Sequence, residues 1–191
     1  EEADVIIEHE GKNTAPAILV AALHVASRDP SGVMVVMPSD HYIPDQYAFT
    51  SKVEDAAKNI HGDQIICLGV RSSRPETGYG YIKVNNTGDQ ISEVEQFVEK
   101  PTLELAKKYL SEGSYLWNAG IFIVGVGELL KLAEELQPDM LQATKAAYDN
   151  SRNDLDFIRL NQELWGKIEG DSFDYAFMEK ASSIGCISFK G

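Results

Sequence analysis

The chain has 191 residues, of which 43% are hydrophobic and 25% are charged, as in ordinary globular proteins that bury a core. Its 17 basic and 30 acidic residues give a net charge of −13, which argues against a protein that tracks nucleic-acid phosphates with a basic face. No apolar stretch reaches the roughly 18 residues needed to cross a bilayer, so neither nucleic acid nor a membrane is expected as a partner.

The first half of the chain alternates short apolar runs with amphipathic stretches. Strands are predicted at 4–8, 32–37 and 64–70, and helices at 15–27 and 45–60. Such alternation is typical of βαβ crossovers, in which a parallel sheet is covered by helices. The predicted fold class is therefore α/β, with a mixed, mostly parallel sheet flanked by helices.

The second half changes character. Two predicted strands, 78–84 and 90–99, flank the turn sequence NNTGD and favour an antiparallel pair. The remaining predicted elements are a helix at 102–110 capped by Thr102, a buried strand at 115–124, a helical stretch from Gly127 to Tyr148 interrupted at Pro138, and a last strand at 184–189.

The chain is interpreted as a single domain over residues 1–191, because no linker rich in proline or glycine divides it. It begins without methionine and stops directly after a strand-like segment, so we expect a partial domain, truncated at both ends. Cys67 and Cys186 lie in apolar runs without CxxC spacing. We expect them to be buried free thiols in a reducing cytoplasm.

Asp40 is the first candidate for chemistry, because it follows the apolar run that ends at Pro38. Ligands of open α/β sheets bind beyond the carboxyl ends of strands. A lone carboxylate there suits Mg²⁺, which takes few protein ligands and keeps substrate oxygens. A turn or capping role explains Asp40 equally well. His41 is interpreted as a structural residue, because no nucleophile nearby needs a base.

The segment EGKNTAPA, residues 10–17, lies between the first strand and its helix. Asn13 and Thr14 carry side chains that form hydrogen bonds, and a helix N-terminus behind them favours an anion or the polar edge of a base. A plain capped helix start is the simpler interpretation.

Three further segments carry polar residues in apolar surroundings. Gly80 has two equally good explanations: a ligand that passes close to the backbone, or a simple β-bulge. Glu99 and Lys100 are neighbours at a strand end; because adjacent strand residues point to opposite faces, no ion pair between them is expected. Asn118 interrupts an apolar strand, so its amide must find partners, either in the backbone or on a ligand hydroxyl.

In order, the motifs GKNTAPAI, MPSDH, RPETGYGYI, FVEKP, YLWNAGIF and FDYAFMEK resemble those of the bacterial mannose-1-phosphate guanylyltransferases, from about Val5 to Gly191. The resemblance implies the Rossmann-like fold of the nucleotide-diphospho-sugar transferases. It also implies a Mg²⁺-dependent reaction in which mannose 1-phosphate and GTP give GDP-mannose and pyrophosphate. Such an in-line attack on the α-phosphorus needs no covalent enzyme intermediate, so catalysis rests on positioning and charge neutralisation.

On the nucleotide side, the resemblance assigns roles to four residues. Asp40 corresponds to one of two aspartates that hold the catalytic Mg²⁺ and meet the nucleotide phosphates. Asn13 and Thr14, with the turn around Ala15, correspond to the segment that holds the guanine.

On the sugar-phosphate side, the resemblance assigns Gly80, Glu99, Lys100 and Asn118. Glu99 and Asn118 would form hydrogen bonds with mannose hydroxyls. Lys100 would neutralise a phosphate, which makes it, with Asp40, an expected catalytic residue.

The sequence also departs from the family. Lys12 stands where the family usually has arginine, which keeps the charge but loses a bidentate fork. The glycine-rich phosphate loop is expected before Glu1 and the second metal aspartate after Gly191, so the chain alone is expected to be inactive. Two alternatives stay open: a relative with another hexose phosphate or nucleotide, and a sugar-nucleotide-binding core without turnover. A homo-oligomer is compatible with the sequence.

Overall fold

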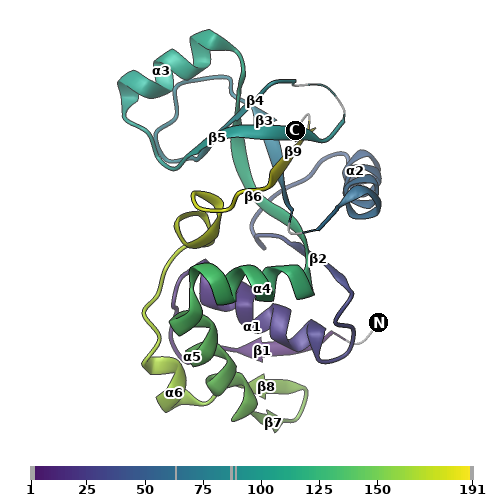
Figure 1. Cartoon of the computed structure of the whole chain (residues 1–191), viewed down its shortest axis with the longest axis vertical. Helices are drawn as coiled ribbons and strands as arrows, with labels where there is room; N and C mark the ends of the chain where they lie inside the picture. Colours follow the sequence, from purple (N-terminus) through teal and green to yellow (C-terminus); the bar gives the residue numbers. More distant parts are fainter. Residues whose placement is uncertain (1–2, 63, 87, 89, 190–191) are drawn as a thin grey trace. The chain divides into compact units, whose positions relative to one another are not determined.

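The computed structural model describes residues 3–62, 64–86, 88 and 90–189. They form two compact units, each assembled from two segments of the chain (Figure 1). The first unit comprises Glu1–Gly32 and Val126–Lys180, and the second comprises Val33–Gly125 and Ala181–Gly191. The single domain over 1–191 stays a prediction. Two residues of the predicted NNTGD turn, 87 and 89, lie outside the described residues.

The first unit consists of helices on a small sheet of order β1-β8-β7. Strand β1 runs parallel to β8, and β8 runs antiparallel to β7. Pro138 occupies the first turn of α5, so the predicted interruption is confirmed. The elements are β1 (Val5–Ile7), α1 (Thr14–Ala26), α4 (Val126–Leu136), α5 (Pro138–Asp149), β7 (Arg152–Asp154), β8 (Phe157–Arg159), α6 (Gln162–Gly166) and the π-helix η1 (Asp174–Met178).

The core of the first unit gathers around Trp165, whose side chain is fully buried. Its indole N–H donates to the carbonyl of Glu10 at 2.9 Å, so the one polar atom of this large side chain is satisfied. Val20 of α1 and Ala147 of α5 pack in the same cluster. Strands β7 and β8 and the π-helix η1 were not predicted. Elements of three to five residues are too short to show a hydrophobic period.

The second unit is a sheet of order β2-β6-β3-β9-β5-β4 in which β4 also pairs with β6, so five strands close into a small barrel. Helix α2 packs on β6 and β9, and α3 packs on β6 (Figure 1). The elements are β2 (Val33–Val36), α2 (Gln46–Asn59), β3 (Ile65–Arg71), β4 (Tyr81–Val84), β5 (Ser92–Val98), α3 (Leu103–Glu112), β6 (Tyr115–Gly125) and β9 (Ile184–Phe189).

The predicted mostly parallel sheet is wrong. In this sheet only β3 and β9 are parallel partners, and the other described pairings are antiparallel. The cause is β6, an eleven-residue strand that takes antiparallel partners along both edges. A continuous apolar run indicates burial on both faces but carries no information about strand direction.

Several local predictions are confirmed. Strands β4 and β5 are antiparallel partners, and the Thr102 hydroxyl caps α3 by accepting from the Leu105 N–H at 3.4 Å. Cys67 and Cys186 are buried free thiols that lie opposite one another on β3 and β9. Among the described residues, no helix has the length and apolar character that a membrane crossing requires.

Candidate functional site

The start of α1 in the first unit carries backbone strain at a predicted site residue. Asn13, the N-cap, has φ 67° and ψ −168°, a region that essentially only glycine occupies without strain. Its side-chain oxygen accepts from the Thr14 N–H at 2.9 Å. Such conformations cost about 1–3 kcal/mol and concentrate at functional positions, so Asn13 is a strong candidate for a ligand contact.

A loop distant in sequence holds this helix start. The Ala15 N–H donates to the Asp171 carbonyl at 3.0 Å, and the Phe173 N–H donates to the Thr14 hydroxyl oxygen at 2.8 Å. Pro16 has no N–H, so the first backbone donors of the helix are engaged or missing. Because Asn13 and Thr14 are exposed while Ala15 is buried, the arrangement favours recognition of a base edge by side chains over binding of an anion by the helix terminus.

The residues before Asn13 are also anchored. The Lys12 ammonium forms an ion pair with Glu10 at 2.8 Å and donates to the Gly166 carbonyl at 3.0 Å, which leaves its side chain largely buried. Burial raises the pKa of Glu8, although a hydrogen bond from the Lys12 backbone opposes this shift. Lys12 thus fastens the loop to α6 in this structure.

Three predicted sugar-phosphate residues converge in the second unit. The Asn118 N–H donates to the Gly80 carbonyl at 2.8 Å. A Cβ built on Gly80 would lie 2.6 Å from Glu99 Oε2 and 3.3 Å from Asn118 Cβ. The absence of a side chain at Gly80 therefore makes room for the Glu99 carboxylate, whose side chain is 8% exposed.

The Glu99 carboxylate has a different neighbour at each oxygen. Lys100 Nζ lies 3.4 Å from Oε1, and Oε2 is the atom nearest to the place of a side chain at Gly80. A buried carboxylate oxygen normally accepts hydrogen bonds, so Oε2 beside Gly80 suits a ligand hydroxyl.

The expectation of no ion pair between Glu99 and Lys100 is wrong. Strand β5 ends at Val98, so the alternation of side chains between faces does not extend to these residues. Lys100 has φ 45°, which turns the chain after the strand and brings its side chain back to Glu99. Asn13 and Lys100 are two of three non-glycine residues with positive φ in the described chain, and both are predicted site residues.

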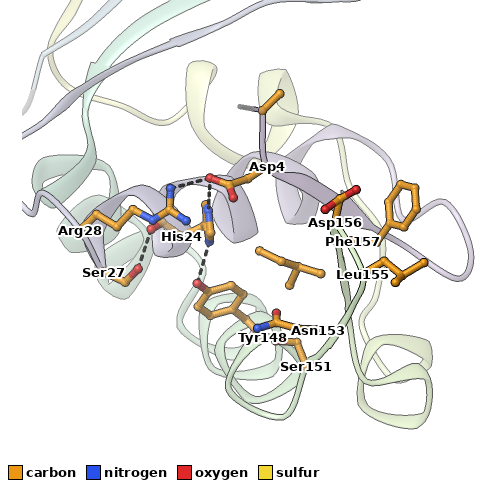
Figure 2. Close-up of a pocket in the computed structure, with 12 residues that line it drawn as sticks. Asp4, His24, Ser27, Arg28, Tyr148, Ser151, Asn153, Leu155, Asp156 and Phe157 are labelled. Carbon is orange, nitrogen blue, oxygen red and sulfur yellow. Dashed lines mark hydrogen bonds and ion pairs between the residues drawn. The ribbon is translucent and has the colours of Figure 1, made fainter. Parts of the chain in front are cut away.

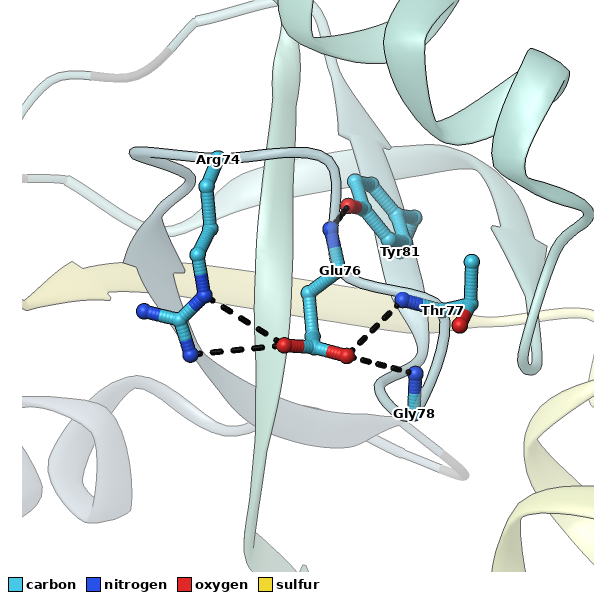
Figure 3. A network of polar contacts seen from close by, with 5 residues as sticks. All are labelled: Arg74, Glu76, Thr77, Gly78 and Tyr81. Carbon is cyan, nitrogen blue, oxygen red and sulfur yellow. Dashed lines mark hydrogen bonds and ion pairs between the residues drawn. The ribbon is translucent and has the colours of Figure 1, made fainter.

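A rigid loop precedes Gly80 (Figure 3). One oxygen of Glu76 accepts from the N–H groups of Thr77 and Gly78 at 3.0 and 3.2 Å, and the other accepts from Arg74 at 3.3 Å. These contacts, the Gly78 N–H foremost, lower the pKa of Glu76. The Tyr81 hydroxyl accepts from the Glu76 N–H at 3.0 Å, which ties the loop to the start of β4.

An aromatic surface continues from this loop. The Arg74 guanidinium lies 5.5 Å from the centre of the Trp117 ring, and Tyr79 packs edge-on against the same ring at 5.4 Å. The buried Trp117 indole N–H has no acceptor among the described residues. Trp117 directly precedes Asn118, so an unused donor lies next to the predicted sugar contacts.

Asp40 is exposed in the segment that follows β2. Val36 of β2 pairs with Phe122 of β6, and a Cβ built on Gly120 would lie 3.7 Å from Pro38. This segment therefore lies along the irregular part of β6, where the register shifts opposite Cys67 and Gly69. Bulges of this kind often occur beside active sites.

The donor set around Asp40 limits the metals it fits. The described residues contain no group of three or more His, Cys, Asp or Glu side chains placed to hold an ion. One exposed carboxylate does not suit zinc, but it fits Mg²⁺, which commonly binds one or two carboxylates with substrate phosphates.

The structure thus brings Gly80, Glu99, Lys100 and Asn118 together and places Asn13 and Thr14 at one helix start in the first unit. Sequence reasoning missed the supporting residues Arg74, Glu76, Asp171 and Phe173. The carboxylate of Glu76 followed by Thr-Gly is a recognisable turn signal, whereas the contact of Phe173 with Thr14 spans 159 residues and has no local signal.

A cavity of about 740 Å³ in the first unit contains none of the predicted site residues (Figure 2). His24 lies at its wall, with Nδ1 2.9 Å from the Tyr148 hydroxyl and Nε2 3.3 Å from Asp4. Asp4 also pairs with Arg28, and the contacts with Arg28 and His24 lower the pKa of Asp4. These contacts tie Asp4, His24, Arg28 and Tyr148 together as in a structural network, although His24 Nε2 lies near Asp4 without a well-formed hydrogen bond.

Comparison with known proteins identifies the family to which the chain belongs. The nucleotidyl transferase family profile matches residues 2–168. The chain belongs to the nucleotidyl transferase family. XanB of Xanthomonas campestris pv. campestris (strain B100), a xanthan biosynthesis protein, is 39% identical over 178 residues, which is 93% of this chain and 38% of XanB.

Two further proteins are similar over nearly the whole chain. Mannose-1-phosphate guanylyltransferase of Escherichia coli (strain K12) is 38% identical over 186 residues, which is 94% of this chain and 39% of that enzyme. A crystal structure of mannose-6-phosphate isomerase from Helicobacter pylori has a TM-score of 0.87 and 28% identity, and covers 96% of this chain and 71% of that one. The chain spans about two fifths of the length of the two curated relatives.

Proposed function

We propose that the protein carrying this chain is a mannose-1-phosphate guanylyltransferase, which transfers GMP from GTP to mannose 1-phosphate and releases pyrophosphate. Membership of the nucleotidyl transferase family supports an enzyme that joins a nucleotide to a sugar phosphate. Two similar proteins are named for enzymes that act on a mannose phosphate, which supports mannose as the sugar of the substrate. The observation that carries the proposal is the convergence of Gly80, Glu99 and Asn118.

The sugar subsite in this proposal is built on the buried carboxylate of Glu99. Its Oε2 would accept from a mannose hydroxyl in the space that Gly80 leaves open. The Asn118 side-chain oxygen accepts from the Gly120 N–H at 3.1 Å, which fixes this side chain at the position where it would meet a sugar oxygen. Loss of either partner leaves a buried polar group unpaired, which is how such sites reject the wrong substrate.

Lys100 would neutralise the phosphate of mannose 1-phosphate. Its side chain is 57% exposed and already lies near Glu99, so it can pair with an incoming dianion without leaving the subsite. A phosphate oxygen of the sugar would attack the α-phosphorus of GTP, forming one P–O bond while the bond to the β-phosphate breaks. Lys100 would act through charge and position, as in other phosphoryl transfers.

Asn13 and Thr14 would bind the guanine at the start of α1. The strain at Asn13 supports a binding role beside its capping role, because strained backbone conformations concentrate at functional positions. Asp40 would hold Mg²⁺ together with nucleotide phosphates, and the ion would offset negative charge on the reacting phosphates. The two buried free thiols support a cytoplasmic enzyme.

The test is pyrophosphate release by the whole protein with a panel of nucleotides and sugar phosphates, with and without Mg²⁺. We expect a preference for GTP and mannose 1-phosphate, and a Mg²⁺ requirement. Preference for dTTP or glucose 1-phosphate would support instead a related enzyme of other specificity. Absence of turnover with retained GDP-mannose binding would support a non-catalytic binding core. We expect the 191-residue chain alone to be inactive.

Variants test the individual roles. Asp40→Asn should lower kcat strongly while folding survives, because the carboxylate is exposed and its charge matters most in the transition state. His41→Ala is the matched control and should be mild. A near-normal kcat in Asp40→Asn would leave Asp40 as a turn residue.

A further inference from the structure

A second cavity of the first unit, about 230 Å³ in volume, has a lining without carboxylates. Its polar residues are His9, Asn150, Arg152, Arg159, Asn161 and Gln162. We call this cavity the arginine pocket. None of these residues belongs to the motifs of the proposed catalytic site.

The two arginines of the pocket are forced together by strand pairing. Arg152 of β7 lies directly opposite Arg159 of β8, so both side chains leave the sheet on the same face. Like charges directly opposite one another destabilise an antiparallel pair. Asp154 compensates Arg159 alone, through Nε at 2.6 Å, and Arg152 forms no ion pair with any described residue.

The charge balance of the chain makes this arrangement unusual. Acidic residues outnumber basic ones by 30 to 17, and most described lysines and arginines have a carboxylate within ion-pair distance. The cavity lined by His24 shows the contrast, because there Asp4 pairs with Arg28 (Figure 2). The lining of the arginine pocket holds two arginines against the single carboxylate of Asp154, and the remaining positive charge suits an external anion.

The remaining lining adds one donor group. His9 does not supply it, because His9 Nε2 lies 3.0 Å from the Leu160 carbonyl, which can only accept, so the proton on this nitrogen is already used. The Asn161 side-chain oxygen accepts from the Leu164 N–H at 3.0 Å, which leaves its NH₂ group as the part available to a ligand.

We propose that the arginine pocket binds a phosphoryl dianion, either free phosphate or the head group of a small phosphomonoester. Guanidinium groups recognise such tetrahedral oxyanions by bidentate, charge-assisted hydrogen bonds. The volume is below the roughly 300–1,000 Å³ of sites that enclose whole drug-sized ligands, so the pocket holds a head group and leaves the rest of the molecule outside. The site is separate from the proposed catalytic residues and does not depend on the proposed function.

The experiment is a titration of the full chain with inorganic phosphate, and separately with glycerol 2-phosphate, followed by backbone amide signals in ¹H–¹⁵N spectra. Sodium chloride at matched ionic strength is the reference. We expect saturable shifts at Arg152, Arg159 and Asn161 with both phosphates and not with chloride. Tighter binding of glycerol 2-phosphate would identify a phosphomonoester as the ligand, and tighter binding of inorganic phosphate would identify the free ion.

Two variants with the same change in charge separate a site from general electrostatics. Arg152→Gln should weaken phosphate binding by about tenfold, the loss expected for one charge-assisted contact. Lys107→Gln, an exposed change on α3 of the second unit, should alter it by less than about twofold, because it lies outside the pocket. Absence of shifts in the wild-type pocket, equal shifts with chloride, or equal weakening in both variants would overturn the proposal.

Discussion

The substitution Gly80→Ala tests the proposed sugar subsite most directly. A methyl group at this position would lie 2.6 Å from Glu99 Oε2, 3.2 Å from Phe97 Cζ and 3.3 Å from Asn118 Cβ. Ordinary contacts begin at 3.4 Å, so the carboxylate would have to retreat by about 0.8 Å while its neighbours leave little room for the methyl group to move away.

Two effects follow from this crowding. Overpacking of a buried position costs typically 1–3 kcal/mol, and we expect about 1–2 kcal/mol in the free energy of unfolding because the nearest atom ends a flexible side chain. A displacement of about 1 Å in a substrate-positioning group can cost up to roughly a hundredfold in activity. We therefore expect the KM for mannose 1-phosphate to rise at least about tenfold, with a much smaller change for GTP.

Denaturant unfolding of the chain gives the first quantity, and steady-state pyrophosphate release by the whole protein gives the second. Gly78→Ala is the matched control, since its methyl group would lie 3.5 Å from Glu76 Oε1, an ordinary contact. If Gly80→Ala and Gly78→Ala changed stability and both KM values alike, the assignment of Glu99 and Gly80 to a sugar subsite would be refuted.

Three other changes have expected outcomes that can be measured on the same protein. Asn13→Gly should raise the free energy of unfolding by about 1 kcal/mol, because glycine adopts φ 67° without strain and loses little as a cap. The same change should weaken GTP binding in a fluorescence titration, and lower stability together with unchanged GTP affinity would contradict this. Glu76 has a pKa held below its ordinary value of 4.5, so the stability that its carboxylate contributes is present above pH 4.5 and is lost as the pH falls through the lowered pKa. In a pH titration, the Gly78 amide signal should show a midpoint below 4.5 that disappears in Glu76→Gln, and a midpoint above 4.5 would disprove the contact. Leu155 is 91% exposed and has φ 54° in the two-residue turn between β7 and β8, a kind of turn that favours glycine. Leu155→Gly should therefore raise the thermal unfolding midpoint, and a lower midpoint would show that this leucine has a packing role.

The order of motifs predicted that Gly80, Glu99, Lys100 and Asn118 belong together, and these residues do gather in one unit. Their role in binding a sugar stays a proposal. What the sequence did not show was the reason for the glycine, which is the carboxylate that occupies the space of its missing side chain. The Glu99–Lys100 pair was likewise predicted incorrectly, since the end of β5 and the positive φ of Lys100 are set by the surrounding fold.

Local signals in the sequence determined where most helices and strands begin and end. Thr102 caps α3, Pro138 separates α4 from α5, and the apolar runs became strands, because each of these effects acts within a few residues. Burial did not follow from the runs alone, since β3 and β9 are buried while β2 is exposed at Val33 and Val35. Only the tertiary structure decided the direction of the strands and the closure of the barrel. Strand direction depends on which distant segment supplies the hydrogen-bonding partner, and β6 accepts antiparallel partners along both edges although its apolar sequence is equally compatible with a parallel sheet.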